Sequence, residues 1–183
     1  MKTRELTLSA LMIATLIICS QLSIPIGLVP VTLQTFAVLI VGMTLTVKNS
    51  LFVTIGYLVL GLIGLPVFAN GSGGIQAVLS PSFGFAIGFI PAAALIAYYL
   101  AKNNTLHLRH YLMIGFLATL VIYLIGLAYM NFILTVIIGN HLSLNQLLMA
   151  GMIPFIPGDI LKIMLSSAVA IRLRPSFSVL PVK

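Results

Sequence analysis

Asp159 and Lys162 are the two residues of this sequence whose types and spacing best suit a chemical role. Asp159 is the one acidic residue after Glu5, and Lys162 follows three positions later in an otherwise apolar segment. Residues three apart on a helix share a face, so these side chains can pair or hold a polar guest between them. A charge at the centre of a bilayer costs about 2.5 to 3.5 kcal/mol on insertion scales, so two retained charges indicate a function. The alternative is an ion pair that only fixes helix packing.

The composition is that of a membrane protein. Hydrophobic residues occupy 61% of the 183 positions and charged residues 6%, whereas roughly 25% of residues are charged in soluble domains. We therefore expect one membrane domain over residues 1–183, embedded in the lipid bilayer, with no room for a soluble catalytic domain. The net charge of +7 comes from bases that stand singly between apolar runs, which argues against nucleic-acid binding.

Other kinds of chemistry find little support in the sequence. Cys19 is the single cysteine and lies among apolar residues, so no metal site or internal disulfide is predicted. The chain has no G-x-x-x-x-G-K-[ST] motif, so we do not expect it to hydrolyse ATP. Ser72 between two glycines suggests a serine hydrolase with His141 as base, but no orienting acid or nucleophile-bearing turn accompanies it. We expect no catalytic residue, no cofactor and no metal.

Six apolar segments predict an all-α fold of membrane-spanning helices: residues 6–24, 31–46, 50–65, 82–101, 111–138 and 154–172. At 1.5 Å per residue, the second and third reach only about 24 Å, less than the roughly 30 Å of the hydrocarbon core. We expect the glycine-rich segment 66–81 to fill the remaining depth as a loop over a pocket, because irregular backbone there needs shielding by protein or a water-filled cavity. An ordinary surface loop is the alternative.

The basic residues predict the orientation. Six spans place both termini on one side, together with the loops at Lys48 and at residues 102–110. That side carries eight of the nine Lys and Arg residues, so the positive-inside rule makes it cytoplasmic in a multi-pass protein of the cell membrane. Lys162 is the exception. It lies toward the outward side, where segment 66–81 and the turn at 155–158 are also expected, so the binding site should face outward.

The start of the last span has the features of a ligand site. Pro157 removes a backbone donor and frees a carbonyl, while Gly158 leaves the backbone open. Phe155, Asp159 and Lys162 then share one face, with an aromatic wall, an acceptor and a cation. Such a site suits a small molecule that joins an apolar body to an amide-like group or a carboxylate. One carboxylate supplies too few oxygen ligands for calcium.

Three segments in register resemble the BioY family, the biotin-specific substrate-binding (S) components of energy-coupling factor (ECF) transporters. They are residues 30–35 (PVTLQT), 64–74 (GLPVFANGSGG) and 155–162 (FIPGDILK), and the resemblance extends over nearly the whole chain. It implies a six-helix membrane protein that captures a vitamin, most specifically biotin, from outside. It also implies uptake driven by ATP through a transmembrane coupling protein and two cytoplasmic ATPase subunits.

The resemblance also implies roles for individual residues. Asp159 and Lys162 match the family's acidic and basic ligands, with Ser72 and Gln34 as further polar contacts. Asp159 would accept from the ureido N–H groups of biotin, and Lys162 would donate to the ureido oxygen or to the carboxylate. The remaining candidates are Phe155 and Phe68, which would form apolar walls, and Gly73 and Gly74, which would let the backbone approach the ligand closely.

A second expected surface lies on the first span. Ala10 and Ala14 stand four residues apart, so one face of the helix carries small side chains. Another helix can approach such a face closely. In S components such a face contacts the coupling protein, so the resemblance assigns Ala10 and Ala14 that role.

The sequence departs from the family at residues 80–86. Where relatives commonly read G-P-T-G-G-Y, this chain reads SPSFGF. Phe83 and Phe85 add bulk and remove a tyrosine hydroxyl, and Ala86 lacks the polar side chain that some relatives carry. The contacts made by this region should therefore differ from those of relatives.

Two other functions remain open on the sequence alone. One is a stand-alone secondary transporter or facilitator of another small metabolite, coupled to no ATPase, although the two similar halves usual in such carriers are not seen. The other is a structural membrane subunit in which Asp159 and Lys162 only pack against each other.

Overall fold

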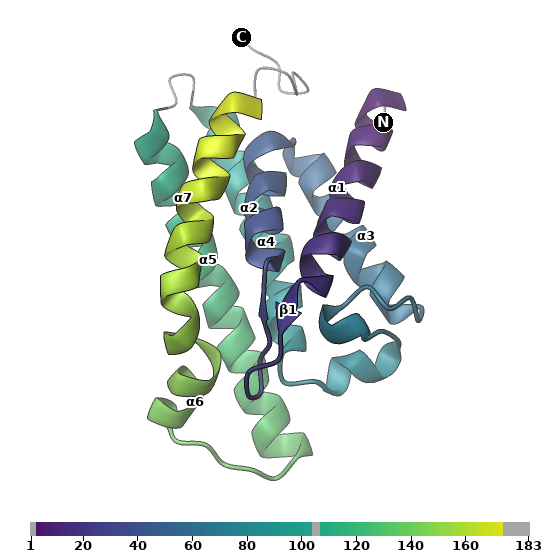
Figure 1. Cartoon of the computed structure of the whole chain (residues 1–183), viewed down its shortest axis with the longest axis vertical. Coiled ribbons are helices and arrows are strands. Elements are labelled where there is room, and N and C mark those ends of the chain that lie inside the picture. The colour runs from purple at the N-terminus through teal and green to yellow at the C-terminus, as the bar shows by residue number, and fades with distance from the viewer. Residues whose placement is uncertain (1–2, 104–106, 174–183) are drawn as a thin grey trace.

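The computed structural model describes residues 3–103 and 107–173 and is built almost entirely of helices (Figure 1). The α-helices are α1 (Thr3–Gln21), α2 (Gln34–Thr44), α3 (Val47–Leu62), α4 (Phe83–Lys102), α5 (Leu108–Phe132), α6 (Leu144–Gly151) and α7 (Ile156–Leu173). Within the described residues, four helical segments are long and apolar enough to cross a membrane: Thr3–Gln21, Phe83–Lys102, Leu108–Ile137 and Leu144–Leu173. Helices α2 and α3 are apolar but shorter. The chain is thus an all-α protein of the multi-pass membrane class.

Helix α2 forms the centre of the bundle. Every residue from Ala37 to Thr44 is buried, and α2 packs against α1, α4 and α7. A helix that is apolar all round is stable only when its neighbours enclose it. Gly42 permits the close approach of α4, because a Cβ at this position would come within 2.9 Å of the Ala93 carbonyl oxygen. Figure 1 shows α2 enclosed between α1 and α7.

The start of the second predicted span is a hairpin instead of a helix. Strand β1 (Ser23–Ile24) pairs antiparallel with β2 (Val31–Thr32), with Ser23 opposite Thr32. The connection contains Pro25, Gly27 and Pro30, and Gly27 has a φ of +64°. Proline disfavours helix at and before its position, and glycine readily adopts positive φ, so α2 begins only at Gln34.

The predicted linker between the fifth and last spans contains a further helix, α6. Ser143 caps it: its hydroxyl accepts from the Gln146 N–H, and the Gln146 side chain accepts from the Ser143 N–H at 2.9 Å. This reciprocal arrangement is the capping box, and the residues Ser143 and Gln146 are visible in the sequence. Hydropathy alone overlooked α6 because the helix is short. A 3-10 turn (Ile153–Phe155) then leads into α7.

The glycine-rich segment folds back on the end of α3. It contains two 3-10 turns, Ala69–Gly71 and Ile75–Leu79. The Gly74 N–H donates to the Gly61 carbonyl at 2.7 Å, and the Phe68 N–H donates to the Ser72 carbonyl at 2.9 Å. The segment therefore has its own internal hydrogen bonds.

Candidate functional site

A cavity of about 640 Å³ lies at the end of the bundle opposite the start of α1 and the end of α7. Its volume is within the range typical of small-molecule sites. Its walls come from the hairpin loop, the glycine-rich segment, the first turns of α2 and α4, the middle of α5 and the start of α7. Segments far apart in the sequence therefore meet around one space.

Asp159 and Lys162 form an ion pair in the wall of this cavity. The Lys162 Nζ lies 2.8 Å from the Asp159 Oδ1, and the two residues are only 8% and 6% exposed, respectively. Asp159 is in the first turn of α7, where the helix dipole favours a carboxylate. The ammonium has further donors and the carboxylate further lone pairs, so the pair can also bind a polar ligand group.

Tyr123 is a polar neighbour that the sequence reasoning missed. Its hydroxyl, from the middle of α5, donates a short hydrogen bond to the Asp159 Oδ2. The two residues are 36 positions apart, and a tyrosine in an apolar span is common. No local spacing pointed to this contact, because it depends on how α5 packs against α7.

Aromatic rings form the apolar walls. Phe68 and Phe155 both line the cavity. The Phe68 ring meets the Phe83 ring edge-on, with centroids 5.8 Å apart. It also covers Gly61, where a Cβ would come within 2.0 Å of the ring, so only glycine leaves room for it.

Phe83, Phe85 and Ala86 also line the cavity. They lie in the first turn of α4, next to the glycine-rich segment. These three side chains are therefore part of the cavity wall itself.

Gln34 lines the cavity, but its amide is engaged by protein partners. The Nε2 donates to the Tyr57 hydroxyl at 2.6 Å, and the Oε1 accepts from the Thr32 hydroxyl at 3.0 Å. One amide hydrogen is left for a ligand. The Tyr57 hydroxyl in turn donates to the Val67 carbonyl, so Gln34 is connected to the glycine-rich segment.

Ser72 and Gly73 also line the cavity, whereas Gly74 is not among the lining residues. The Ser72 hydroxyl donates to the Ala69 carbonyl at 2.9 Å, and Ser72 is exposed. A Cβ at Gly73 would come within 2.1 Å of the Leu65 carbonyl oxygen. Gly74 has a φ of +90°, a backbone conformation in which other residues would be strained. Gly74 therefore contributes to the turn geometry and not to the cavity wall.

The end of α1 ties down the glycine-rich segment. The Ser20 hydroxyl donates to the Val67 carbonyl, and the Gln21 Nε2 donates to the Pro66 and Phe68 carbonyls at 3.1 and 3.2 Å. From α5, the Tyr129 hydroxyl donates to the Val78 carbonyl. The glycine-rich segment (66–81), which we call the cavity cover, is thus held by hydrogen bonds from both α1 and α5.

Ala10 and Ala14 do not belong to this site. Both are exposed on the outer face of α1, while Ser9 between α1 and the bundle is fully buried. They form a small surface that another helix could approach. Among residues 3–103 and 107–173, no group of three or more His, Cys, Asp or Glu side chains could hold a metal ion.

Comparison with known proteins gives a consistent result. The BioY family model matches residues 1–179. The chain is 36% identical to the probable biotin transporter BioY of Pyrococcus horikoshii, over 95% of this chain and 98% of that protein. It is 32% identical to the biotin transporter BioY of Thermotoga maritima, over 93% and 96% of the two chains. The crystal structure of an S-component for biotin from an ECF-type ABC transporter superposes with a TM-score of 0.85 at 31% identity, covering 95% of this chain and 92% of the other.

Proposed function

This chain belongs to the BioY family, and on that premise we propose that it captures biotin at the membrane as the S component of an ECF transporter. Its function is then transport and not catalysis. The observation that carries the proposal is the buried Asp159–Lys162 pair in the wall of a cavity of small-molecule size. A pair used only for packing would not need to border such a space.

The chemistry of biotin matches the groups that line the cavity. Its ureido N–H groups can donate to the Asp159 carboxylate, and its ureido oxygen or carboxylate can accept from Lys162. Its apolar bicycle fits between Phe68 and Phe155. Ser72 and Gln34 can supply secondary polar contacts, with Gly73 allowing the backbone to come close and Gly74 shaping the loop.

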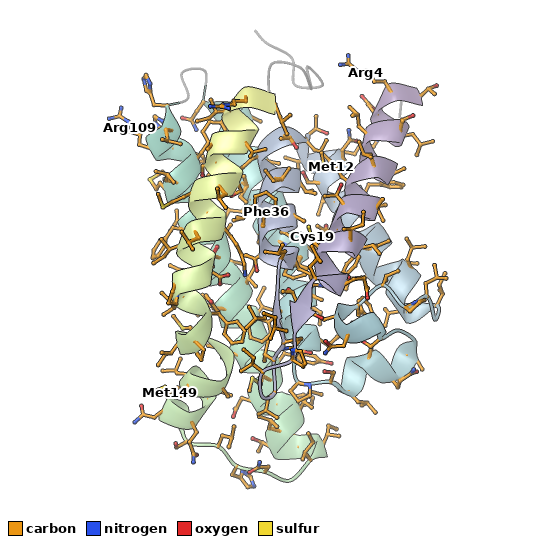
Figure 2. The ribbon with its side chains drawn as sticks, in the orientation of Figure 1. Arg4, Met12, Cys19, Phe36, Arg109 and Met149 are labelled. Atoms are coloured by element: carbon orange, nitrogen blue, oxygen red, sulfur yellow. The ribbon has the colours of Figure 1, made fainter. Side chains whose placement is uncertain are left out.

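We propose that the cavity faces outward and that both termini are cytoplasmic. The described basic residues other than Lys162 lie near helix ends at one end of the bundle: Arg4, Lys48, Lys102, Arg109 and Arg172. Figure 2 shows Arg4 and Arg109 at this end. Cytoplasmic loops carry the excess of Lys and Arg, so the cavity, at the other end, opens to the outside.

We further propose that transport needs partners, namely a transmembrane coupling protein and two cytoplasmic ATPase subunits. The sequence has no P-loop motif, so ATP would be hydrolysed by another chain. The exposed Ala10 and Ala14 on α1 offer a face small enough for close contact with a helix of the coupling protein.

Two measurements test the function. Purified protein should bind biotin in a saturable titration by isothermal calorimetry, and Arg109→Ala, at the opposite end of the molecule, should bind equally well. Absence of binding by the unmodified protein would contradict the proposal. In cells that lack the coupling ATPases, biotin uptake through this chain should fall strongly. Uptake at the full rate would instead favour a stand-alone carrier.

A further inference from the structure

Tyr123 holds the side of the Asp159 carboxylate that Lys162 leaves open. Lys162 donates to Oδ1 and Tyr123 donates to Oδ2, so each carboxylate oxygen has its own donor. One donor comes from α7 itself and the other from α5. All three residues are buried and line the main cavity.

A second, smaller cavity is also lined by Tyr123 and Asp159. Its volume is about 180 Å³, and it shares Thr119, Tyr123 and Asp159 with the main cavity. Its other lining residues are apolar: Phe116, Leu120, Met152, Ile156, Ile160 and Ile163. The Tyr123–Asp159 hydrogen bond therefore borders both the main cavity, whose walls are part polar and part apolar, and a smaller cavity whose other walls are apolar.

No other lining side chain of this smaller cavity replaces the Tyr123 donor. The Thr119 hydroxyl already donates to the Gly115 carbonyl at 2.9 Å, and the side chains of the other apolar lining residues carry no N–H or O–H group. Without the Tyr123 hydroxyl, Oδ2 would face an apolar space with no partner there. An unpaired carboxylate oxygen is costly in such surroundings, so the carboxylate would reorient.

The ring of Tyr123 is itself fixed by packing. It meets the Phe85 ring edge-on, with centroids 6.3 Å apart and planes at 88°. Phe85 occupies the space over Gly126, where a Cβ would come within 2.5 Å of the Phe85 ring. The Tyr123 hydroxyl is therefore aimed at Asp159 by neighbours on α4 and α5.

We propose that Tyr123 is a positioning residue for ligand binding, which fixes the Asp159 carboxylate so that its free lone pairs point at the N–H donors of the ligand. The proposal rests on the proposed function, because the ligand is taken to be biotin. With both oxygens already accepting, Asp159 stays an acceptor, and the site selects a ligand that presents N–H groups.

The test compares Tyr123→Phe with Tyr111→Phe. Tyr111 is also buried in α5 but does not line either cavity. Tyr123→Phe should weaken biotin binding by about 10-fold or more. This is the loss expected when a reoriented Asp159 carboxylate no longer accepts one hydrogen bond from the ligand. Without ligand, Tyr123→Phe should still fold, with a melting temperature lowered by only a few degrees, because the buried hydrogen bond to Asp159 is lost. Tyr111→Phe should keep the affinity.

Infrared spectroscopy gives a readout that a merely structural role would not move. Asp159 and Glu5 are the only acidic side chains of the sequence, so in a Glu5→Gln background the side-chain carboxylate band is that of Asp159. Its antisymmetric stretch should shift in Tyr123→Phe and not in Tyr111→Phe. Should Tyr123→Phe not fold, Tyr123→Met also lacks the hydroxyl and serves for both measurements.

The outcomes separate this inference from the proposed function. If the unmodified protein does not bind biotin, the proposed function fails, whatever the infrared band does. If the unmodified protein binds but Tyr123→Phe binds equally well, or leaves the band unshifted, the positioning role is wrong while the function stands.

Discussion

Gln21, the last residue of α1, donates from its Nε2 to the carbonyl oxygen of Phe68 at 3.2 Å. Phe68 lines the cavity, so this bond joins the end of α1 directly to the cavity cover. The same amide donates to the Pro66 carbonyl at 3.1 Å. For the glycine-rich segment to lift away from α1, both bonds must break.

Replacing Gln21 by leucine should therefore let the cover open more easily. We expect biotin to dissociate about 3- to 10-fold faster, since a neutral hydrogen bond contributes about 1 kcal/mol and mutations act mainly on dissociation. The measurement is the release of radiolabelled biotin from purified protein. Leu22→Ala, the exposed next residue, should leave the release rate unchanged. Equal rates in both variants would show that the cover is not held through α1.

Replacing both Asp159 and Lys162 should restore the stability that either single replacement loses, but it should not restore biotin binding. Asp159→Asn or Lys162→Met alone leaves one buried charge without its partner, which typically costs about 3–5 kcal/mol. The double variant removes both charges and should recover most of the melting temperature of the ligand-free protein. Because biotin would lose its charged partners, all three variants should bind it at least 10-fold more weakly. If the double variant bound biotin like the unmodified protein, the pair would serve only for packing.

The general architecture was predictable because long apolar runs have few alternatives to membrane helices. The Asp159–Lys162 contact was predictable as well, since it depends only on helical spacing within one segment. Phe155 was predicted from its helical spacing with Asp159 and Lys162, whereas Phe68 was proposed only through the resemblance to the BioY family.

Features that depend on packing between helices were not predictable. Tyr123 contacts Asp159 across 36 positions, and its direction depends on the fit of Phe85 over Gly126. The hydrogen bonds of Gln34 were not predictable for the same reason, because its partner Tyr57 lies on another helix, α3. The short helix α6 could have been predicted from its Ser143 and Gln146 capping box, although hydropathy did not reveal it.

The small face of α1 gives a prediction about assembly. Ala10→Trp or Ala14→Trp should keep biotin binding, because both residues are exposed and lie outside the cavity. Each should reduce co-purification with the coupling protein, since a bulky side chain prevents close helix approach. Leu11→Trp is the matched control, because it enlarges an exposed residue of α1 that is already bulky. A complex that survives both alanine replacements would assign this face another use.

The orientation can be tested because Cys19 is the one cysteine of the sequence and is buried. In a Cys19→Ser background, single cysteines can be placed at Asn140 and at Lys48, which are both exposed. Asn140 precedes α6 at the cavity end, whereas Lys48 is in the first turn of α3 at the basic end. An outward-facing cavity predicts that a membrane-impermeant maleimide labels Asn140→Cys in intact cells. It should label Lys48→Cys only after the membrane is permeabilised, because the positive-inside rule puts that end in the cytoplasm. The reverse pattern would place the cavity on the cytoplasmic side and rule out capture from outside.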